Sequence, residues 1–243
     1  MAKSKTDRSF YELAIRDFDA ALRINPQYAE AYAARGDAHS LIAVELSETE
    51  ENSKAERRTY FNRALADYSK AIDLKPTYAP AYTGRADTYI ELELSDRAVA
   101  DCTSAVQLDP NYALAYYQRG RALDQERQYR LAIDDYTRAI TLDANDSDSH
   151  YFRAGAYFKL AESQNNSDYY ERALVDYNTV VSNWPKITEA YLGRGETLES
   201  LGRCNEANKD FKKALDSDDD EVRKKAQDRL SGPSKCGRGR GAV

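Results

Sequence analysis

Apolar residues recur along the chain in one fixed pattern. Six alanines are each followed by an aromatic residue or cysteine four positions later, and by alanine or valine seven positions later. Positions 0, 4 and 7 lie on one face of an α-helix, so each alanine indicates an amphipathic helix. A proline twelve positions after four of them predicts the helix end, because the residue before proline avoids the α region. The six alanines are Ala14, Ala64, Ala98, Ala132, Ala173 and Ala207.

A second helix is predicted after each of the first five. It is marked by tyrosine, or once by histidine, with glycine or alanine four positions later. A small residue one helical turn away lets a neighbouring helix approach closely. The chain is therefore predicted to be all-α and built from hairpins of two amphipathic helices. The marked pairs are Tyr32 and Gly36, Tyr82 and Ala86, Tyr116 and Gly120, His150 and Ala154, and Tyr191 and Gly195.

The hairpins repeat with a period of 34 residues. Successive alanines of the first pattern are separated by 50, 34, 34, 41 and 34 residues. The two longer separations exceed the period by 16 and 7 residues. They place insertions near residues 43–60 and 161–170, inside a hairpin in both cases. Both segments are polar, and we expect the longer one to lengthen both helices of its hairpin. Functional loops and tolerated length variation explain such insertions equally well.

This period and these residue types resemble the tetratricopeptide repeat family. The resemblance covers roughly residues 10–220 and about six repeats, with His150, Cys102 and Val180 departing conservatively from the pattern. It implies a right-handed α-solenoid with a concave groove. We expect one array over residues 1–231, with a first repeat truncated at its N-terminus, a capping helix at about 220–230, and a disordered tail at 232–243.

Composition narrows the classes of partner. The chain has 41 acidic and 35 basic residues and a net charge of −6, which argues against nucleic acid or an anionic membrane as the main partner. It contains no run of 18 apolar residues, and no apolar stretch follows its basic start. The cysteines Cys102, Cys204 and Cys236 have neither metal-ligand spacing nor a disulfide framework. We expect a reducing, cytoplasmic location.

Arginine and aspartate hold fixed places in the repeat. An arginine precedes the small residue of five hairpins, and an aspartate follows each alanine of the first pattern by three positions. We expect an arginine–aspartate ladder between successive helices; a row of anion-binding arginines is the alternative. The arginines are Arg35, Arg85, Arg119, Arg153 and Arg194, and the aspartates are Asp17, Asp67, Asp101, Asp135, Asp176 and Asp210.

The family resemblance places the groove on the first helix of each hairpin, opposite its core stripe. Most charges there are acidic, and apolar or aromatic residues gather in the middle of the array, which suits a peptide or helix with basic and apolar residues. Solvated acids with aromatics packed between repeats are the alternative. The family's Lys, Asn and Arg clamp for chaperone tails is absent. The candidate partner-binding residues are Asp37, Asp87, Glu91, Leu114, Tyr117, Arg121, Asp124, Tyr151 and Phe158.

No motif indicates catalysis. The phosphate-binding loop, zinc-protease, serine-hydrolase and paired-cysteine motifs are missing, and "DANDSDSH" lacks the glycine and the final acid of a calcium loop. We expect no catalytic residue, no metal and no cofactor. The sequence favours a non-catalytic scaffold or adaptor for proteins. An assembly chaperone or regulatory subunit, self-associating through the truncated first repeat, is the alternative, and an RNA-associated factor using the "GRGRG" tail is a third hypothesis.

Overall fold

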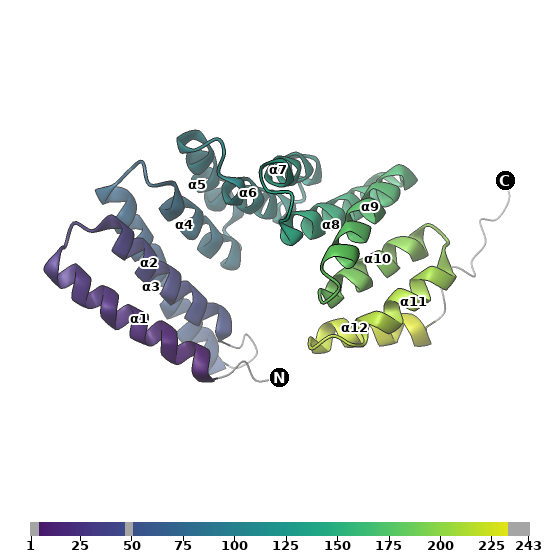
Figure 1. Ribbon diagram of the computed structural model, residues 1–243, viewed down its shortest axis with the longest axis horizontal. Coiled ribbons are helices and arrows are strands. Elements are labelled where there is room, and N and C mark those ends of the chain that lie inside the picture. The colour runs from purple at the N-terminus through teal and green to yellow at the C-terminus, as the bar shows by residue number, and fades with distance from the viewer. Residues whose placement is uncertain (1–4, 47–50, 233–243) are drawn as a thin grey trace. The chain divides into compact units, whose positions relative to one another are not determined.

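The computed structural model describes residues 5–46 and 51–232, and these residues form helices and no strand (Figure 1). This confirms the predicted all-α fold. The helices are α1 (Lys5–Ile24), α2 (Ala29–Glu45), α3 (Glu51–Leu74), α4 (Ala79–Glu91), α5 (Ser95–Leu108), α6 (Ala113–Gln125), α7 (Tyr129–Leu142), α8 (Ser147–Gln164), α9 (Ser167–Asn183), α10 (Thr188–Ser200), α11 (Cys204–Ala214) and α12 (Asp220–Ser231).

The chain divides into two compact units, residues 1–126 and 127–243. In the first unit, α2 packs on α3 and α4 packs on α5, so that consecutive helices form hairpins. In the second unit, α8 packs on α9 and α10 packs on α11, while α12 contacts both α10 and α11. The hairpins predicted from the alternating patterns are therefore present in both units.

The two insertions lengthen helices. The regular hairpin of α4 and α5 has helices of 13 and 14 residues. The hairpin with the 16-residue excess has helices of 17 and 24 residues, α2 and α3, on either side of the undescribed residues 47–50. The hairpin with the 7-residue excess has helices of 18 and 17 residues, α8 and α9. Each insertion thus adds helical turns within one hairpin.

Aromatic rings fill the space that the small residues leave. Tyr68 on α3 is 1% exposed, and its ring lies between Gly36 on α2 and Gly84 on α4. A Cβ atom at Gly36 would stand 2.9 Å from the Tyr68 ring, and one at Gly84 would stand closer still. Phe211 occupies the same kind of gap at Gly195, where a Cβ would lie 2.6 Å from the ring. The small residues therefore admit the aromatic ring of a following helix.

The arginine–aspartate ladder is formed. Both oxygens of each aspartate accept from one guanidinium group at 2.5–2.9 Å, which gives the planar, two-bond geometry that arginine favours. The pairs are Arg35 with Asp67, Arg85 with Asp101, Arg153 with Asp176, and Arg194 with Asp210. The guanidinium of Arg119 lies 5.6 Å from the centre of the Tyr116 ring.

Each of these four arginines also reaches backwards along the chain. The remaining guanidinium nitrogen donates to the side chain 16 residues upstream, in the helix that precedes the hairpin. The acceptors are Asp19, Ser69, Thr137 and Asn178. One arginine thus fixes three consecutive helices, which is the structural role that the sequence assigned to it.

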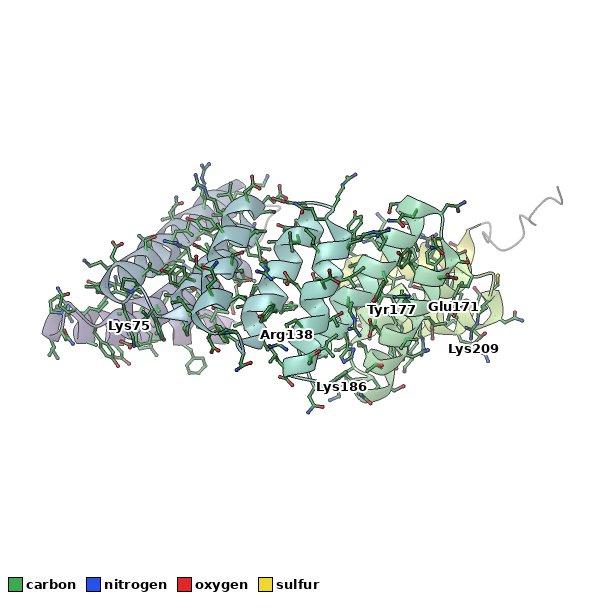
Figure 2. The ribbon with its side chains drawn as sticks, turned by 90° about the horizontal axis from the view of Figure 1, so that it is seen from above. Lys75, Arg138, Glu171, Tyr177, Lys186 and Lys209 are labelled. Atoms are coloured by element: carbon green, nitrogen blue, oxygen red, sulfur yellow. The ribbon has the colours of Figure 1, made fainter. Side chains whose placement is uncertain are left out.

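The last described helix, α12, closes the apolar end of the second unit. Asp219 accepts from the backbone N–H groups of Glu221 and Val222, which fixes the start of the helix. Val222 and Ala226 are buried in a cluster with Phe211. Figure 2 shows Tyr177 among the helices of this unit, whereas Lys186 and Lys209 point away from them.

The cysteines differ from one another. Cys102 is a buried free thiol inside the hairpin of α4 and α5. Cys204 is half-buried at the start of α11. Cys236 and the basic tail lie outside the described residues. Among the described helices, none combines the length and the apolar character that crossing a bilayer requires.

Candidate partner-binding site

A cavity of about 320 Å³ opens in the first unit between residues of α2, α3, α4 and α6. Its size is at the lower end of the range for small-molecule or side-chain pockets. Two of the predicted acids and one predicted apolar residue line it. The lining residues are Asp37, Ser40, Leu41, Tyr68, Pro80, Thr83, Gly84, Asp87, Tyr112, Leu114 and Gln118.

The carboxylate of Asp37 is held by a tyrosine from the core. The Tyr68 hydroxyl donates to Asp37 Oδ1 at 2.7 Å, reaching it between Gly36 and Gly84. Asp37 keeps solvent contact on the cavity side, while the helices behind it desolvate the carboxylate. This desolvation, together with the charge of Asp87, raises the pKa of Asp37 above its ordinary value. Within the described residues, no cation forms an ion pair with Asp37.

The second acid of the cavity, Asp87, is neutralised from the next hairpin. Its Oδ1 atom accepts from Gln118 Nε2 at 3.0 Å and from an Arg121 guanidinium nitrogen at 2.6 Å. Arg121 also donates to Glu91 at 3.2 Å, and Glu91 accepts from Arg57 at 3.3 Å. The predicted residues Asp87, Glu91 and Arg121 therefore form one ion-pair network beside the cavity.

The rim of the cavity is apolar. Leu41 on α2 is 45% exposed and Leu114 on α6 is 43% exposed. Pro80 is exposed at the start of α4, and the hydroxyls of Thr83 and Tyr112 lie 3.4 Å apart. A carboxylate without an ion-pair partner among the described residues, in a cavity rimmed by two exposed leucines, suits a ligand that carries a cation next to apolar groups.

Two further predicted residues of the first unit, Tyr117 and Asp124, do not line this cavity. Tyr117 is half-buried, and its ring centre lies 5.9 Å from the Arg121 guanidinium carbon. This distance is within the range of a cation–π interaction. Asp124 is half-buried in the last turn of α6.

The two predicted aromatics of the second unit pack on other rings. On α8, Tyr151 meets Tyr177 edge to face at 6.0 Å, and Phe158 meets Tyr170 edge to face at 5.3 Å between ring centres. Burial raises the pKa of Tyr151 above its ordinary value, with smaller contributions from acidic neighbours. The nine candidates therefore belong to two separate units, and only Asp37, Asp87 and Leu114 line the cavity.

Other acids of the expected groove face are also paired inside the chain. Lys75 donates to Glu30 at 2.5 Å. Arg229 of α12 donates to Glu196 at 2.8 Å and to Glu199 at 3.3 Å. The acidic character of this face is thus largely compensated by the chain's own cations, and Asp37 stands out because it accepts from a neutral hydroxyl.

Eight of the eleven residues that line the cavity were not among the sequence candidates, and Tyr68, Gln118 and Leu41 are three of them. Tyr68 was assigned to the core stripe, Gln118 precedes the ladder arginine of its hairpin, and Leu41 lies on a turn of α2 beyond the marked positions. The one signal for Tyr68 in the sequence is Gly84, two positions after Tyr82, since a glycine there leaves room for a ring from the preceding helix. In the described part of the chain, no three His, Cys, Asp or Glu side chains gather as metal ligands would.

Comparison with known families identifies the repeat. Residues 113–146 match one model of the tetratricopeptide repeat, and residues 79–112 and 188–221 match another. These segments contain α6 with α7, α4 with α5, and α10 with α11. The chain is a tetratricopeptide repeat protein. Its described helices fit the six repeats that the sequence pattern predicts, and no curated protein sequence matches the chain.

Solved tetratricopeptide structures share this fold. The crystal structure of MamA is 28% identical, covers 70% of this chain and 95% of its own, and has a TM-score of 0.57. YrrB, described as a protein of this repeat type with an unusual peptide-binding site, is 23% identical, with coverages of 86% and 97% and a TM-score of 0.59. TTC0263, a thermophilic protein of Thermus thermophilus, is 18% identical, with coverages of 80% and 98% and a TM-score of 0.60. The tetratricopeptide chain is therefore an α-solenoid.

Proposed function

We propose that this tetratricopeptide protein is a non-catalytic scaffold that binds a partner peptide or helix through the Asp37 cavity. The partner would place a lysine or arginine against Asp37 and apolar side chains against Leu41 and Leu114. The observation that carries the proposal is the Asp37 carboxylate itself, which is open to solvent at the cavity, held by Tyr68 and without an ion-pair partner among the described residues.

A cation from a partner gains more here than at an ordinary surface acid. The helices have already removed part of the water around Asp37, so an incoming cation restores interactions that the carboxylate lacks in the free protein. Charge-assisted hydrogen bonds of this kind contribute roughly 1.5–3 kcal/mol. The neutralised Asp87 contributes little net charge, which makes Asp37 the position that selects for a basic residue.

The fold supports an interaction function in general terms. Repeat arrays present extended surfaces to other proteins, and one structural neighbour, YrrB, is described as having a peptide-binding site. The apolar rim formed by Leu41 and Leu114 would supply the contact area that a single ion pair cannot. The candidate residues Tyr117, Glu91 and Arg121 would border the same ligand, whereas Asp124, Tyr151 and Phe158 remain proposals without a contact to this cavity.

A selection from a random peptide library tests the proposal. We expect peptides rich in lysine or arginine, with adjacent apolar residues, to be enriched on the wild-type protein and lost on Asp37→Asn. The matched control is Asp73→Asn, which removes the same charge from an exposed position on α3. Equal enrichment of basic peptides on Asp37→Asn and wild type would refute the assignment of this cavity.

One observation favours the alternative role as an assembly chaperone or regulatory subunit. Phe10 and Leu13 on α1 are 63% and 50% exposed, which is unusual for large apolar residues of a repeat helix. In that role α1 would dock on another subunit or on a second copy of the chain. Light scattering of the wild type and of Phe10→Asp with Leu13→Asp decides whether self-association through this helix occurs, because only the wild type should then be larger than a monomer.

The cytoplasmic location is also a proposal. It rests on the small number of cysteines and on the buried free thiol of Cys102, and an oxidising compartment is the alternative. To distinguish a reducing from an oxidising compartment, the protein is isolated from its native source, its free thiols are alkylated, and its gel mobility is measured without reductant. A fully reduced Cys204 supports the cytoplasmic location, and an oxidised Cys204 contradicts it.

A further inference from the structure

A second cavity lies in the second unit, between the start of α7 and the end of α8. Its volume is about 780 Å³, which is more than twice that of the Asp37 cavity. We call it the α7–α8 cavity. Its lining residues are Arg127, Gln128, Tyr129, Arg130, Leu131, Lys159, Leu160, Glu162, Ser163 and Gln164.

The 7-residue insertion builds one wall of this cavity. Helices α4 and α6 have 13 residues, whereas α8 has 18 and continues to Gln164. The added turn carries Ser163 and Gln164 beside the start of α7, and Arg130 donates to Gln164 Oε1 at 3.1 Å. The insertion therefore contributes side chains to the lining that a helix of 13 residues would not supply.

The charges of the lining are predominantly positive. Arg127, Arg130 and Lys159 face a single acid, Glu162, so the lining carries a net charge of +2. Neither Arg127 nor Arg130 forms an ion pair with any described residue. Lys159 lies over the Tyr129 ring, with 5.7 Å between its nitrogen and the ring centre. Beside these cations, Leu131 is an apolar residue that is 52% exposed.

The first unit contains the equivalent cavity one repeat upstream, and its charge is opposite. That cavity, of about 580 Å³, lies between the start of α5 and the end of α6. It contains Glu93, Asp96 and Glu126 against Arg97, a net charge of −2. At a shift of 34 residues, Glu93 becomes Arg127 and Asp96 becomes Arg130. The sign of the charge in each cavity is thus set by side chains at equivalent backbone positions of two successive repeats.

We propose that the α7–α8 cavity binds an acidic segment of a partner protein. Carboxylates of the segment would pair with Arg127 and Arg130, and an apolar side chain beside them would cover Leu131. The backbone N–H groups of the first turn of α7 lie at this end of the helix, beside the cavity, and add positive potential. This surface uses none of the residues of the Asp37 cavity, and it selects a ligand of opposite charge.

An acidic peptide fits these observations better than a nucleic acid. The whole chain carries a net charge of −6, which opposes the long-range approach of a polyanion. Two arginines and one lysine can contact few phosphates of a nucleic-acid backbone. The exposed Leu131 makes no favourable contact with a phosphate. A short segment with carboxylates and one apolar residue uses all of these groups.

The test compares two variants with equal changes in net charge. Arg127→Glu with Arg130→Asp installs the residues of the upstream repeat at the same backbone positions. Lys186→Glu with Lys209→Glu makes the same charge change at two exposed lysines of the second unit that point away from its helices (Figure 2). A random peptide library displayed on phage is selected on the wild type, and the selected peptides are measured on both variants. Circular dichroism checks that all proteins fold.

The proposal expects acidic peptides with an apolar residue among the wild-type selection. Their affinity should fall by about tenfold or more on Arg127→Glu with Arg130→Asp, because two charge-assisted contacts become repulsive. It should stay within about twofold on the lysine control, where only weak surface electrostatics change. Asp37→Asn should leave the affinity for these acidic peptides unchanged. The proposal for the α7–α8 cavity and the proposal for the Asp37 cavity can therefore be confirmed or refuted independently.

Four outcomes would overturn it. The wild type could yield no acidic peptides, or the arginine variant could bind them as well as the wild type does. An equal loss on both variants would show a response to net charge alone. A single-stranded RNA oligonucleotide that displaces the peptides, and that depends on the same arginines, would assign the surface to nucleic acid instead.

Discussion

The Tyr68 hydroxyl donates a hydrogen bond to Asp37 at 2.7 Å, although the Tyr68 ring is buried in the core and Asp37 faces a cavity. One side chain therefore connects the packing of three helices with the charge of the candidate site. The connection depends on the two glycines that let the ring pass between α2 and α4. Changes to the core and changes to the site are consequently coupled at this residue.

Tyr68→Phe should separate the two roles of this tyrosine. The ring still fills the gap, so we expect a loss of only about 0.5–1.5 kcal/mol in the free energy of unfolding, the usual contribution of one hydrogen bond. The Asp37 pKa should rise further, because the hydrogen bond from Tyr68 favours the charged carboxylate. Urea denaturation and an NMR titration of Asp37 measure these effects. An unchanged Asp37 pKa would contradict the assigned hydrogen bond.

Asp37→Asn should stabilise the free protein at neutral pH. The folded-state pKa of Asp37 lies above its unfolded value, so the folded state binds a proton more tightly than the unfolded state does. This group therefore favours folding at low pH, and the benefit disappears as pH rises through the folded pKa. The variant's advantage should be present at pH 7 and vanish towards pH 3. Thermal melts across this range measure it, and a destabilised variant at pH 7 would count against the desolvated carboxylate.

Asp176→Asn should be among the more damaging single changes to a polar residue. Burial of Asp176 opposes its ionisation, but hydrogen bonds from Arg153 and His150 outweigh this effect and hold its pKa below the ordinary value. Breaking a buried pair leaves one charge uncompensated and typically costs about 3–5 kcal/mol, and since Arg153 is partly exposed we expect about 2–3 kcal/mol.

The same carboxylate makes a pH prediction. A depressed folded-state pKa contributes stability above the unfolded pKa, and this contribution is lost as pH falls through the folded pKa. The difference in unfolding free energy between wild type and Asp176→Asn should therefore be present above about pH 4 and shrink as the pH falls below it. The exposed pair Arg203 and Glu206 provides the control, since Glu206→Gln should change stability little.

Gly84→Ala should destabilise the protein, whereas Gly155→Ala should not. A methyl group at Gly84 would overlap the buried ring of Tyr68, and overpacking of this kind costs about 1–3 kcal/mol. At Gly155 on α8 the nearest atom would be 3.8 Å from the new Cβ, an ordinary contact. There the higher helix propensity of alanine should add up to about 1 kcal/mol. Chemical denaturation of both variants checks the contrast, and equal effects would show that the ring does not occupy the gap.

The repeat pattern was sufficient to predict the hairpins and the ladder. Both depend on residues at fixed helical spacing, such as Arg85 with Asp101, and the spacing survives any small shift of one helix against another. The identity of the fold follows from the same regularity. The periodicity of the sequence therefore predicts those parts of the structure that every repeat has in common.

The candidate site could be predicted only in part, because it depends on what differs between repeats. The sequence places Asp37, Asp87 and Arg121 at one position of three successive hairpins, but it does not show that Arg121 turns back to Asp87. Nor does it show that a core residue, Tyr68, extends its hydroxyl to Asp37. Both facts depend on the separation of neighbouring helices and on side-chain direction, which periodicity leaves open.

The ladder arginines also set a rule for where the chain can change length. Each reaches the residue 16 positions before it in all four observed cases, while its aspartate follows after 16, 23 or 32 positions. Added residues are therefore accommodated between the two helices of a hairpin and never between one hairpin and the next. A designer who grafts a binding loop or a small domain onto this protein should open the turn inside a hairpin, because a graft at the other kind of turn would separate the arginine that follows it from its acceptor 16 residues upstream.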